Sequence, residues 1–533
     1  MAPPRARAAH WSIAALLAVT AALYAYGLNH APPYLGGDEA HFGIHGHALA
    51  HSGRNLGGAF LPLFVNLWDP LADQSEKGLK RRWYSPMLFY VTAAYLTVAP
   101  LNEVTVRLPM ALIAGVVSPL LLYLLAWQIL KRRDAALLAA LLLAWSPSNL
   151  ILGRQALDYL LPLPFILGWL YYLAVFLEKG GRSRPFVGGL LLGVGFYSYI
   201  ASWIFMPLCL ALGAVTYRRA GRGDWLNASL VSAAGFALPL LPLVPWFLTH
   251  PELLGDTFQR YQAPDGGAVA WLNYTAPFLN YVSFFNPQLL FVTGGPVPTT
   301  SLGRAGVFLL PVAALVPSGV LALLKRGLPS GMGFVLVAGV LLSPVPAIAA
   351  GEAQMIQRVM FLLPFMILIA CAGFVRLWTS PSRLLRAAVV LLIAMLPLQF
   401  AYVYRDYFTN YQHRSAFYYD PVAFRDVATF VLDTEAASAV PQVYFSRDLD
   451  DAGAKWRFYT TMHNRQDLLP RTQYVDVDSA ALRDAPLASL LVMYDATAPL
   501  NALLDTHRWR MVKNVRDLDG RSAALILQRV AAP

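Results

Sequence analysis

Two adjacent carboxylates, Asp38 and Glu39, follow a pair of glycines about ten residues after the first long apolar segment ends. If that segment crosses a membrane, both carboxylates lie just outside the bilayer, where ionisable side chains commonly mark a functional site. Neighbouring residues on a helix point about 100° apart, so one carboxylate can act as a general base while the other orients it. The structural alternative is a helix N-terminus, which acidic residues in the first turn stabilise.

Histidines close to this acidic pair allow a metal site. His41 and His45 are separated by four residues, and Asp38 precedes His41 by three, so the three side chains share one helix face. The spacing matches no specific zinc motif, and a polar helix face at the membrane interface explains it equally well. The pattern therefore requires no cofactor, and a divalent metal ion held by His41 and His45 remains an open alternative.

Further charged residues lie near the outer ends of apolar segments. Arg154 and Asp158 occupy a short turn, where they either pair with each other or bind an anionic substrate and a sugar hydroxyl. Arg358 opens a later segment, where it either extends to the interface or binds a lipid phosphate. Arg81 and Arg82 form a basic cluster in the first outer loop, against the usual charge bias, which indicates an anionic partner.

The composition identifies a polytopic membrane protein. Of the 533 residues, 57% are hydrophobic and only 13% are charged, whereas soluble domains carry about 25% charged residues. The formal net charge of +11 could suggest a nucleic-acid partner, but the basic residues form short clusters between apolar segments. That distribution is typical of cytoplasmic loops. Both cysteines lie in apolar segments, so no disulfide framework is indicated.

The apolar segments predict eleven transmembrane helices and a cytoplasmic N-terminus, because alternation from that start leaves the main basic clusters in the cytoplasm. This transmembrane catalytic domain covers residues 1–405, and its first outer loop covers about residues 28–107. Within the loop, Pro86–Val98 is too short to cross, since a span needs about 20 residues, and is predicted to lie at the interface. The predicted spans are Trp11–Leu28, Arg107–Leu130, Ala135–Leu152, Tyr159–Leu177, Phe186–Tyr199, Ser202–Tyr217, Trp225–Leu248, Arg304–Leu324, Met332–Ala350, Arg358–Trp378 and Leu385–Tyr404.

Residues 406–533 have a soluble composition and predict an extracytoplasmic α/β domain. A helix is predicted over Val422–Leu432, between strands. With eleven spans and a cytoplasmic N-terminus, this domain lies outside, which is the periplasm if the membrane is a bacterial inner membrane. The predicted strands are Gln442–Phe445, Gln473–Val477, Ser489–Tyr494 and Ala523–Leu527.

The order of several short motifs resembles the membrane-embedded C-type glycosyltransferases (GT-C), in particular the protein O-mannosyltransferase and aminoarabinose transferase branch. The likeness covers about residues 10–405. The motifs that carry it are Gly37-Asp38-Glu39-Ala40, Ser85-Pro86-Met87-Leu88-Phe89-Tyr90, Val106-Arg107-Leu108-Pro109, the turn from Arg154 to Asp158, the bend Tyr197-Ser198-Tyr199, Asn286-Pro287-Gln288-Leu289-Leu290-Phe291 with Gly294-Gly295, and Ile356-Gln357-Arg358 with Pro364.

The resemblance implies transfer of a hexosyl or pentosyl group from a polyprenyl-phosphate donor to a lipid, glycan or protein acceptor on the outer face of the membrane, with inversion. It implies that Asp38 is the general base and Glu39 its catalytic neighbour. Relatives often carry Lys or His where this chain has Ser85, so phosphate binding passes to Arg81, Arg82 or Arg358. The substrate-binding candidates are Arg81, Arg82, Tyr84, Arg154, Asp158, Tyr199 and Arg358.

A transporter or flippase of lipid-linked sugars is the alternative function. It would also be polytopic and carry charges at membrane depth. Against it, the chain has no inverted repeat, and its intramembrane charges gather near one face.

Overall fold

The structure is a computed structural model that describes residues 4–70, 82–221, 223–261, 275–324, 331–351, 354–495, 503–504 and 508–531. The chain divides into two compact units. The helical unit comprises Met1–Tyr26, Ser85–Leu88 and Met110–Asp406. The mixed unit comprises Gly27–Tyr84, Phe89–Pro109 and Tyr407–Pro533.

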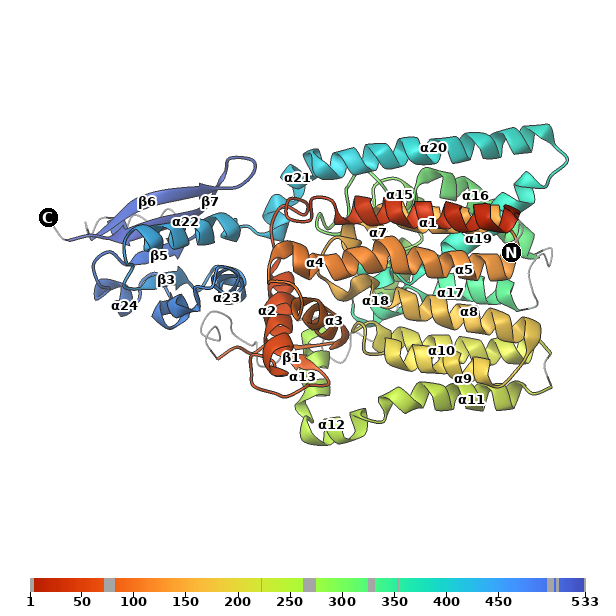
Figure 1. The fold of residues 1–533 in the computed structure, drawn as a ribbon, viewed down its shortest axis with the longest axis horizontal. Helices are drawn as coiled ribbons and strands as arrows, with labels where there is room; N and C mark the ends of the chain where they lie inside the picture. The colour runs from red at the N-terminus through yellow and green to blue at the C-terminus, as the bar shows by residue number, and fades with distance from the viewer. Residues whose placement is uncertain are drawn as a thin grey trace. The chain divides into compact units, whose positions relative to one another are not determined.

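The helical unit is a bundle in which the long apolar helices run side by side, as α5, α8, α10 and α11 do in Figure 1. Its helices are α1 (Pro4–Ala25), α5 (Ser118–Leu130), α6 (Arg133–Ala144), α7 (Pro147–Gly153), α8 (Leu163–Lys179), α9 (Ser183–Gly195), α10 (Ser202–Arg219), α11 (Trp225–Ala237), α12 (Leu243–Thr249), α13 (Glu252–Tyr261), α14 (Thr275–Ser283), α15 (Pro287–Phe291), α16 (Leu310–Leu324), α17 (Met332–Leu342), α18 (Val345–Ala349), α19 (Leu362–Trp378) and α20 (Arg383–Phe408).

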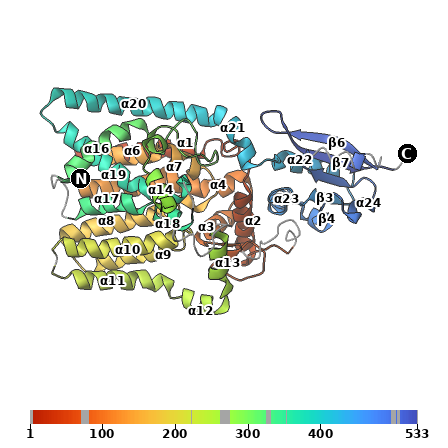
Figure 2. The ribbon, with the colours of Figure 1, turned by 180° about the vertical axis from the view of Figure 1, so that it is seen from behind.

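Glycines bring neighbouring helices of this bundle into close contact. A Cβ atom on Gly189 of α9 would lie 1.9 Å from the carbonyl oxygen of Ser232 on α11. One on Gly319 of α16 would lie 1.9 Å from the carbonyl oxygen of Ile369 on α19, and Figure 2 shows α16 and α19 as neighbours. Small residues at helix crossings are the usual way to pack helices in lipid, where apolar burial drives no association.

Four helical segments of the described residues are long and apolar enough to cross a membrane: Glu103–Leu130, Asp158–Lys179, Met332–Ala349 and Arg383–Phe408. Two bent pairs raise this number to six if each is one span: Arg133–Ala144 with Pro147–Gly153, and Trp225–Leu240 with Leu243–Thr249. The structure is thus mostly helical, as expected of a polytopic membrane protein, while the number of eleven spans stays a prediction.

Two local features agree with the sequence, while the position of Pro86–Val98 at the membrane interface stays a prediction. The segment Pro86–Val98 forms only a short helix, α3 (Met87–Leu96). The chain also breaks between α9 and α10, where the bend at Tyr197-Ser198-Tyr199 was predicted. Helix α3, like α4 (Glu103–Leu112), begins in one unit and ends in the other.

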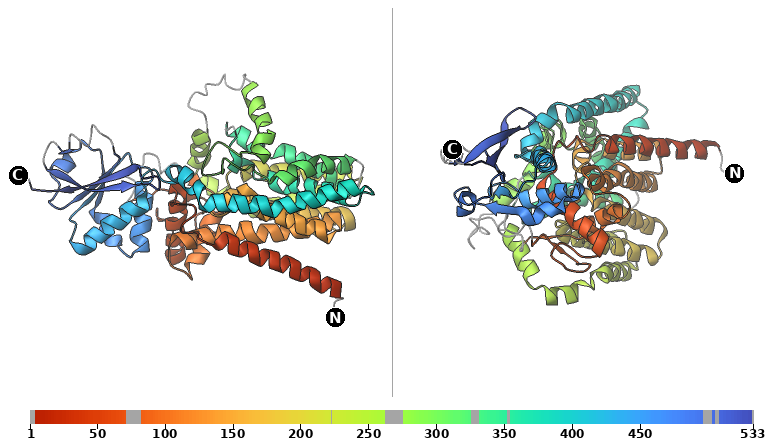
Figure 3. Two further views of the ribbon diagram at one scale, coloured as in Figure 1. Left: turned by 90° about the horizontal axis from the view of Figure 1, so that it is seen from above. Right: turned by 60° about the vertical axis from the view of Figure 1, so that its left-hand side comes forward.

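The mixed unit contains a five-stranded sheet in the order β4-β3-β5-β7-β6. Strand β3 runs parallel to β4 and β5, whereas β7 is antiparallel to both β5 and β6. The strands, which the left panel of Figure 3 shows from the side with helices below them, are β3 (Val443–Ser446), β4 (Thr472–Val475), β5 (Leu490–Met493), β6 (Trp509–Arg516) and β7 (Ser522–Arg529). The helices of this part are α21 (Asn410–Tyr419), α22 (Phe424–Ala437), α23 (Ala452–Met462) and α24 (Ala480–Arg483).

Side-chain alternation along the strands separates two apolar layers. Phe445 of β3 packs its ring against Phe424 of α22 and Trp456 of α23, at centroid distances of 5.4 and 5.3 Å. Its neighbour Tyr444 points to the opposite face and joins a second cluster with Leu482 of α24. The sheet is therefore buried on both faces, which explains why its central strands are apolar throughout.

The first outer loop packs with this sheet domain as one body. It contains α2 (Gly37–Ser52) and a short hairpin of β1 (Val65–Asn66) and β2 (Trp83–Tyr84), and α2 packs against α23. Two ion pairs join the loop to the C-terminal domain: Asp69 with Arg457 at 2.6 Å, and Glu103 with Arg425. The sequence-based division places the boundary at residue 406. In the structure, the loop before that boundary and the domain after it belong to one compact unit.

Candidate active site

Glu39 lies at the start of α2, and both oxygens of its carboxylate accept hydrogen bonds. Its side chain is 1% exposed, and its Oε2 accepts a hydrogen bond of 3.0 Å from the backbone N–H of Gly36. The Nε and Nη2 of Arg107 donate to the two carboxylate oxygens at 2.9 and 2.8 Å. This bidentate geometry is the strongest form of an arginine–carboxylate pair. Glu39 thus joins the helix start to α4.

Arg107 completes this clamp with the backbone that precedes α2. Its guanidinium, which is fully buried, donates to the carbonyl oxygens of Leu28, Pro32 and Tyr34 at 2.8, 3.2 and 2.6 Å. A buried charge pair is stable only when its remaining donors and acceptors are satisfied, and these bonds meet that condition. The clamp fixes the turn that leads into α2 and so the direction of Asp38.

Asp38 is placed differently from its neighbour. Its side chain is half-buried, and its Oδ1 accepts a hydrogen bond of 2.6 Å from the hydroxyl of Tyr84. Tyr84 pairs with Val65 between β1 and β2, and its ring packs edge-on against Phe42 at 5.8 Å. Asp38 is therefore an oriented carboxylate that solvent can reach, as a general base must be.

Asp451, from the C-terminal domain, approaches the same turn. Its Oδ1 lies 3.9 Å from Nε2 of His41 and 4.0 Å from Nη1 of Arg82. A Cβ atom on Gly37 would lie only 1.5 Å from the Oδ2 of Asp451. Sequence reasoning missed this residue, because the C-terminal domain carries no binding signature and only folding brings it to the acidic pair.

The two histidines of the metal hypothesis face the protein interior. Burial lowers the pKa of His41, and burial followed by repulsion from His41 lowers the pKa of His45 well below its ordinary value. The Nδ1 of His45 accepts from the backbone N–H of Leu56 at 3.5 Å, and the two rings are 6.2 Å apart. No group of three or more potential metal ligands occurs among the described residues, so the geometry gives the metal hypothesis no support.

In the helical unit, two of the predicted substrate-binding residues, Arg358 and Tyr199, are in direct contact. The Nη1 of Arg358 donates to the Tyr199 hydroxyl at 2.7 Å, and its guanidinium carbon lies 5.5 Å from the centre of that ring. Tyr159 packs edge-on against Tyr199 at 5.5 Å. Arg358 also lines a cavity of about 300 Å³ whose other walls are mainly apolar. This cavity combines one cationic end with an apolar body.

The turn that follows α7 in the helical unit is built around Arg154. This side chain is fully buried and donates to the carbonyl oxygens of Leu23, Tyr24 and Tyr26 at 3.1, 2.7 and 2.7 Å. Carbonyls at a helix C-terminus lack partners within the helix, and a cation there is favourable. Arg154 therefore caps the end of α1. Asp158, 6% exposed, begins the short helical turn that follows.

Two solved structures have folds similar to that of this chain. ArnT from Cupriavidus metallidurans bound to undecaprenyl phosphate matches with a TM-score of 0.63 over 98% of both chains, at 16% sequence identity. The apo state of ArnT from the same organism matches with a TM-score of 0.61 over 98% of this chain and 99% of that one, also at 16% identity. This chain has the GT-C fold.

Sequence comparison agrees with the GT-C resemblance. The family model described as dolichyl-phosphate-mannose-protein mannosyltransferase matches residues 84–248. No curated protein matches the chain. The resemblance predicted from the order of short motifs is confirmed at the level of the GT-C fold.

Within this chain the predicted site residues fall into two groups. Asp38, Glu39, Arg82 and Tyr84 belong to the mixed unit, and within it Asp38 and Tyr84 are in direct contact. Arg154, Asp158, Tyr199 and Arg358 belong to the helical unit, and within it Tyr199 and Arg358 are in direct contact. Arg81 lies outside the described residues.

Proposed function

We propose that the chain is a membrane glycosyltransferase that moves a hexosyl or pentosyl group from a polyprenyl-phosphate-linked donor to an acceptor on the outer face of the membrane. Asp38 is the general base. The observation that carries this proposal is that the two carboxylates have different surroundings. Glu39 is buried in an ion pair with Arg107, whereas Asp38 is only half-buried and is oriented by a hydrogen bond from Tyr84. If the acidic pair served only to stabilise the start of α2, Glu39 alone would be sufficient and Asp38 would not be needed.

The reaction is a single displacement. Asp38 accepts the proton of an acceptor hydroxyl as that oxygen attacks the anomeric carbon of the donor sugar. The bond between that carbon and the phosphate oxygen breaks, and the polyprenyl phosphate leaves with the bonding electrons. Attack opposite to the leaving group inverts the anomeric carbon. The leaving phosphate gains charge, which Arg82, a cation in the same unit as Asp38, is the candidate to stabilise.

The cavity at Arg358 supports a lipid-phosphate donor. Its apolar walls include Phe196, Trp203 and Ile204, and Arg358 supplies the cation. An isoprenoid chain needs an apolar groove and its phosphate needs a charged donor, which matches this combination. ArnT, which shares the fold, has been solved with undecaprenyl phosphate bound.

The packing of the mixed unit supports the proposed orientation. The first outer loop and the C-terminal domain share two ion pairs whose carboxylates are buried, so we infer that both lie on the same side of the membrane. An odd number of crossings then separates them from the N-terminus, in agreement with eleven spans. With the N-terminus cytoplasmic, we infer a bacterial inner-membrane protein whose mixed unit is periplasmic.

A transporter or flippase of lipid-linked sugars is the second candidate, and the same cavity favours it. An apolar groove with one cation would hold a lipid phosphate equally well for translocation. Asp38 distinguishes the two functions, because translocation requires no general base.

The test is transfer of radiolabelled sugar from polyprenyl-phosphate hexose and pentose donors to a cell-envelope extract. We expect product from the wild type and a loss of about 10²- to 10⁴-fold in Asp38→Asn, the contribution typical of a general base. Asp433→Asn is the matched control, because Asp433 is exposed on α22. Equal product from Asp38→Asn and the wild type would refute the assignment of the base, and folded wild type without product on any donor would favour the transporter.

A further inference from the structure

The C-terminal domain contains a cavity of about 830 Å³ that the proposed reaction does not use. It lies on the face of the sheet covered by α24, and Leu482, Leu503 and Trp509 of the second apolar cluster line it. Pockets that hold small molecules in proteins commonly measure about 300–1,000 Å³. This one is large enough for a mono- or disaccharide.

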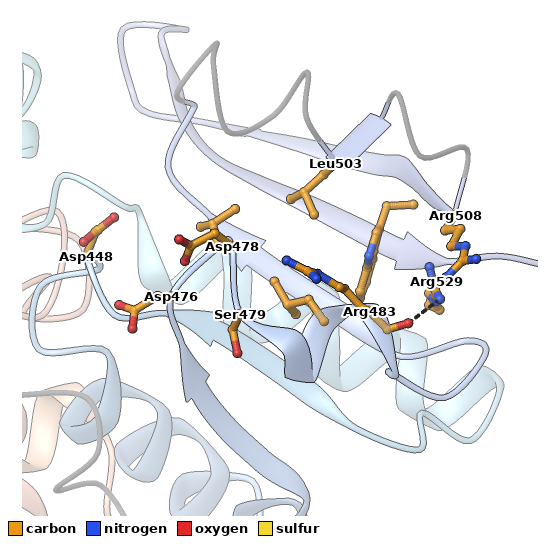
Figure 4. A pocket seen from close by; sticks show the side chains of 11 residues that line it. Asp448, Asp476, Asp478, Ser479, Arg483, Leu503, Arg508 and Arg529 are labelled. Carbon is orange, nitrogen blue, oxygen red and sulfur yellow. Dashed lines mark hydrogen bonds between the residues drawn. The ribbon is translucent and has the colours of Figure 1, made fainter.

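One end of the cavity is basic. Arg508 directly precedes β6 and Arg529 ends β7, and Figure 4 shows the two side chains close together. The guanidinium of Arg529 lies 5.7 Å from the centre of the Trp509 ring, and its Nη2 donates to the carbonyl oxygen of Arg483 at 2.8 Å.

Within the part of the chain that the structure describes, Arg529 is a buried cation that has an unsatisfied hydrogen-bond donor. Its side chain is 9% exposed, and among the described residues its Nε has no hydrogen-bond partner. Burial, followed by repulsion from Arg508, lowers the pKa of Arg529. A buried Nε–H on Arg529 without a partner in the described ranges, next to a second guanidinium, that of Arg508, is the arrangement that an anion relieves.

The other end is acidic. Asp476 and Asp478 follow β4, and Asp448 follows β3, so all three lie beyond the carboxyl ends of parallel strands (Figure 4). Asp476 is paired with Arg447 at 3.2 Å. Carboxylates accept hydrogen bonds from sugar hydroxyls but repel a second phosphate. The ligand must therefore carry its anionic group at one end only.

We propose that this cavity is a binding site for a phosphorylated saccharide. Arg508 and Arg529 hold the phosphate, the sugar ring lies over the apolar floor formed by Leu482, Leu503 and Trp509, and the sugar hydroxyls face Asp478. The inference goes beyond the proposed transfer reaction and does not rest on it, since binding here requires neither Asp38 nor the lipid donor.

The test is calorimetric titration of the full chain in detergent with glucose 6-phosphate, glucose and inorganic phosphate. We expect glucose 6-phosphate to bind at least tenfold more tightly than either part. Arg529→Gln and Arg508→Gln should each weaken it about tenfold or more, because a hydrogen bond to a charged group contributes about 1.5–3 kcal/mol. Arg510→Gln is the matched control, since Arg510 is exposed on β6 and does not line the cavity.

The same saccharide could be soluble or part of a lipid. Octyl glucoside 6-phosphate carries the same head group on an alkyl tail: tighter binding than glucose 6-phosphate assigns a lipid head group, and equal binding assigns a soluble sugar. Failure of glucose 6-phosphate to bind at millimolar concentration overturns the proposal, as does unchanged binding in both Arg529→Gln and Arg508→Gln. Because no turnover is measured, this result is independent of whether Asp38 is a base.

Discussion

Replacement of Gly37 by alanine tests whether the C-terminal domain shapes the acidic turn. Gly37 is the first residue of α2, where alanine would ordinarily stabilise the helix by about 0.5–1 kcal/mol. In the structure its added Cβ would lie 1.5 Å from Oδ2, 2.2 Å from Cγ and 2.7 Å from Cβ of Asp451. Rotation of the Asp451 side chain relieves the first two contacts but leaves the third, so the backbone must move. Overpacking of this kind costs about 1–3 kcal/mol.

The expected result is thus a loss of stability where helix propensity alone predicts a gain. The free energy of unfolding of the full chain, measured by denaturant titration in detergent, should fall by about 1–3 kcal/mol in Gly37→Ala. Gly36→Ala is the matched control, because its Cβ would lie 3.7 Å from its nearest neighbour, the Oε2 of Glu39, an ordinary contact. Its cost should stay within about 1 kcal/mol, the effect of a changed N-cap.

A second substitution identifies the cause. Asp451 has a φ of +51°, a conformation that glycine adopts without strain, so Asp451→Gly removes all three clashing atoms at little backbone cost. The double variant Gly37→Ala/Asp451→Gly should recover about 1–3 kcal/mol relative to the sum of the single changes. If Gly37→Ala is as stable as the wild type, or if Asp451→Gly restores nothing, the packing of Asp451 on this turn is wrong.

Three further predictions concern the same turn. Glu39→Gln leaves the buried guanidinium of Arg107 without its counter-charge and should cost about 3–5 kcal/mol in denaturant titration, whereas Asp38→Asn should cost no more than about 1 kcal/mol. Tyr84→Phe removes the hydrogen bond that orients Asp38, so kcat for sugar transfer should fall about tenfold or more, with normal folding as the control. His45 has a lowered pKa in the folded state, so its contribution to stability is present above its ordinary pKa near 6.5 and is lost as the pH falls below it. Below that pH, this group should make the free energy of unfolding fall by about 1.4 kcal/mol per pH unit. His45→Asn should make this pH dependence shallower, and an unchanged pH dependence would contradict the burial of His45 in its neutral form.

Much of the fold could be predicted because its signals are local. Apolar segments and their flanking charges give the helices, and the four predicted strands correspond to β3, β4, β5 and β7. The predicted helix Val422–Leu432 is α22, displaced to Phe424–Ala437. Strand β6 was missed, since it lies at the sheet edge and exposes Arg510 and Lys513 to solvent. An edge strand needs few apolar residues, so its pattern is weak.

The site could be predicted only in part, because its contacts join distant segments. Asp38 was recognised from its position after the first apolar segment, but the partner of Glu39 lies 68 residues further on. Arg107 was noted in a family motif without any indication of what it binds. Asp451 has no specific signal in the sequence, because aspartates are common in soluble-like domains. Only the packing of α23 against α2 brings it to the turn.

The two adjacent carboxylates divide the work of one site. Side chains one residue apart on a helix diverge by about 100°, so they cannot serve the same partner. Glu39 points inward, where Arg107 neutralises its charge and ties the turn to three backbone carbonyls. Asp38 accepts the hydrogen bond of Tyr84 instead, and in the proposed reaction it is the base whose position Glu39 fixes. A general base must be held rigidly and yet stay accessible, and placing the anchor on the adjacent residue meets both requirements at once.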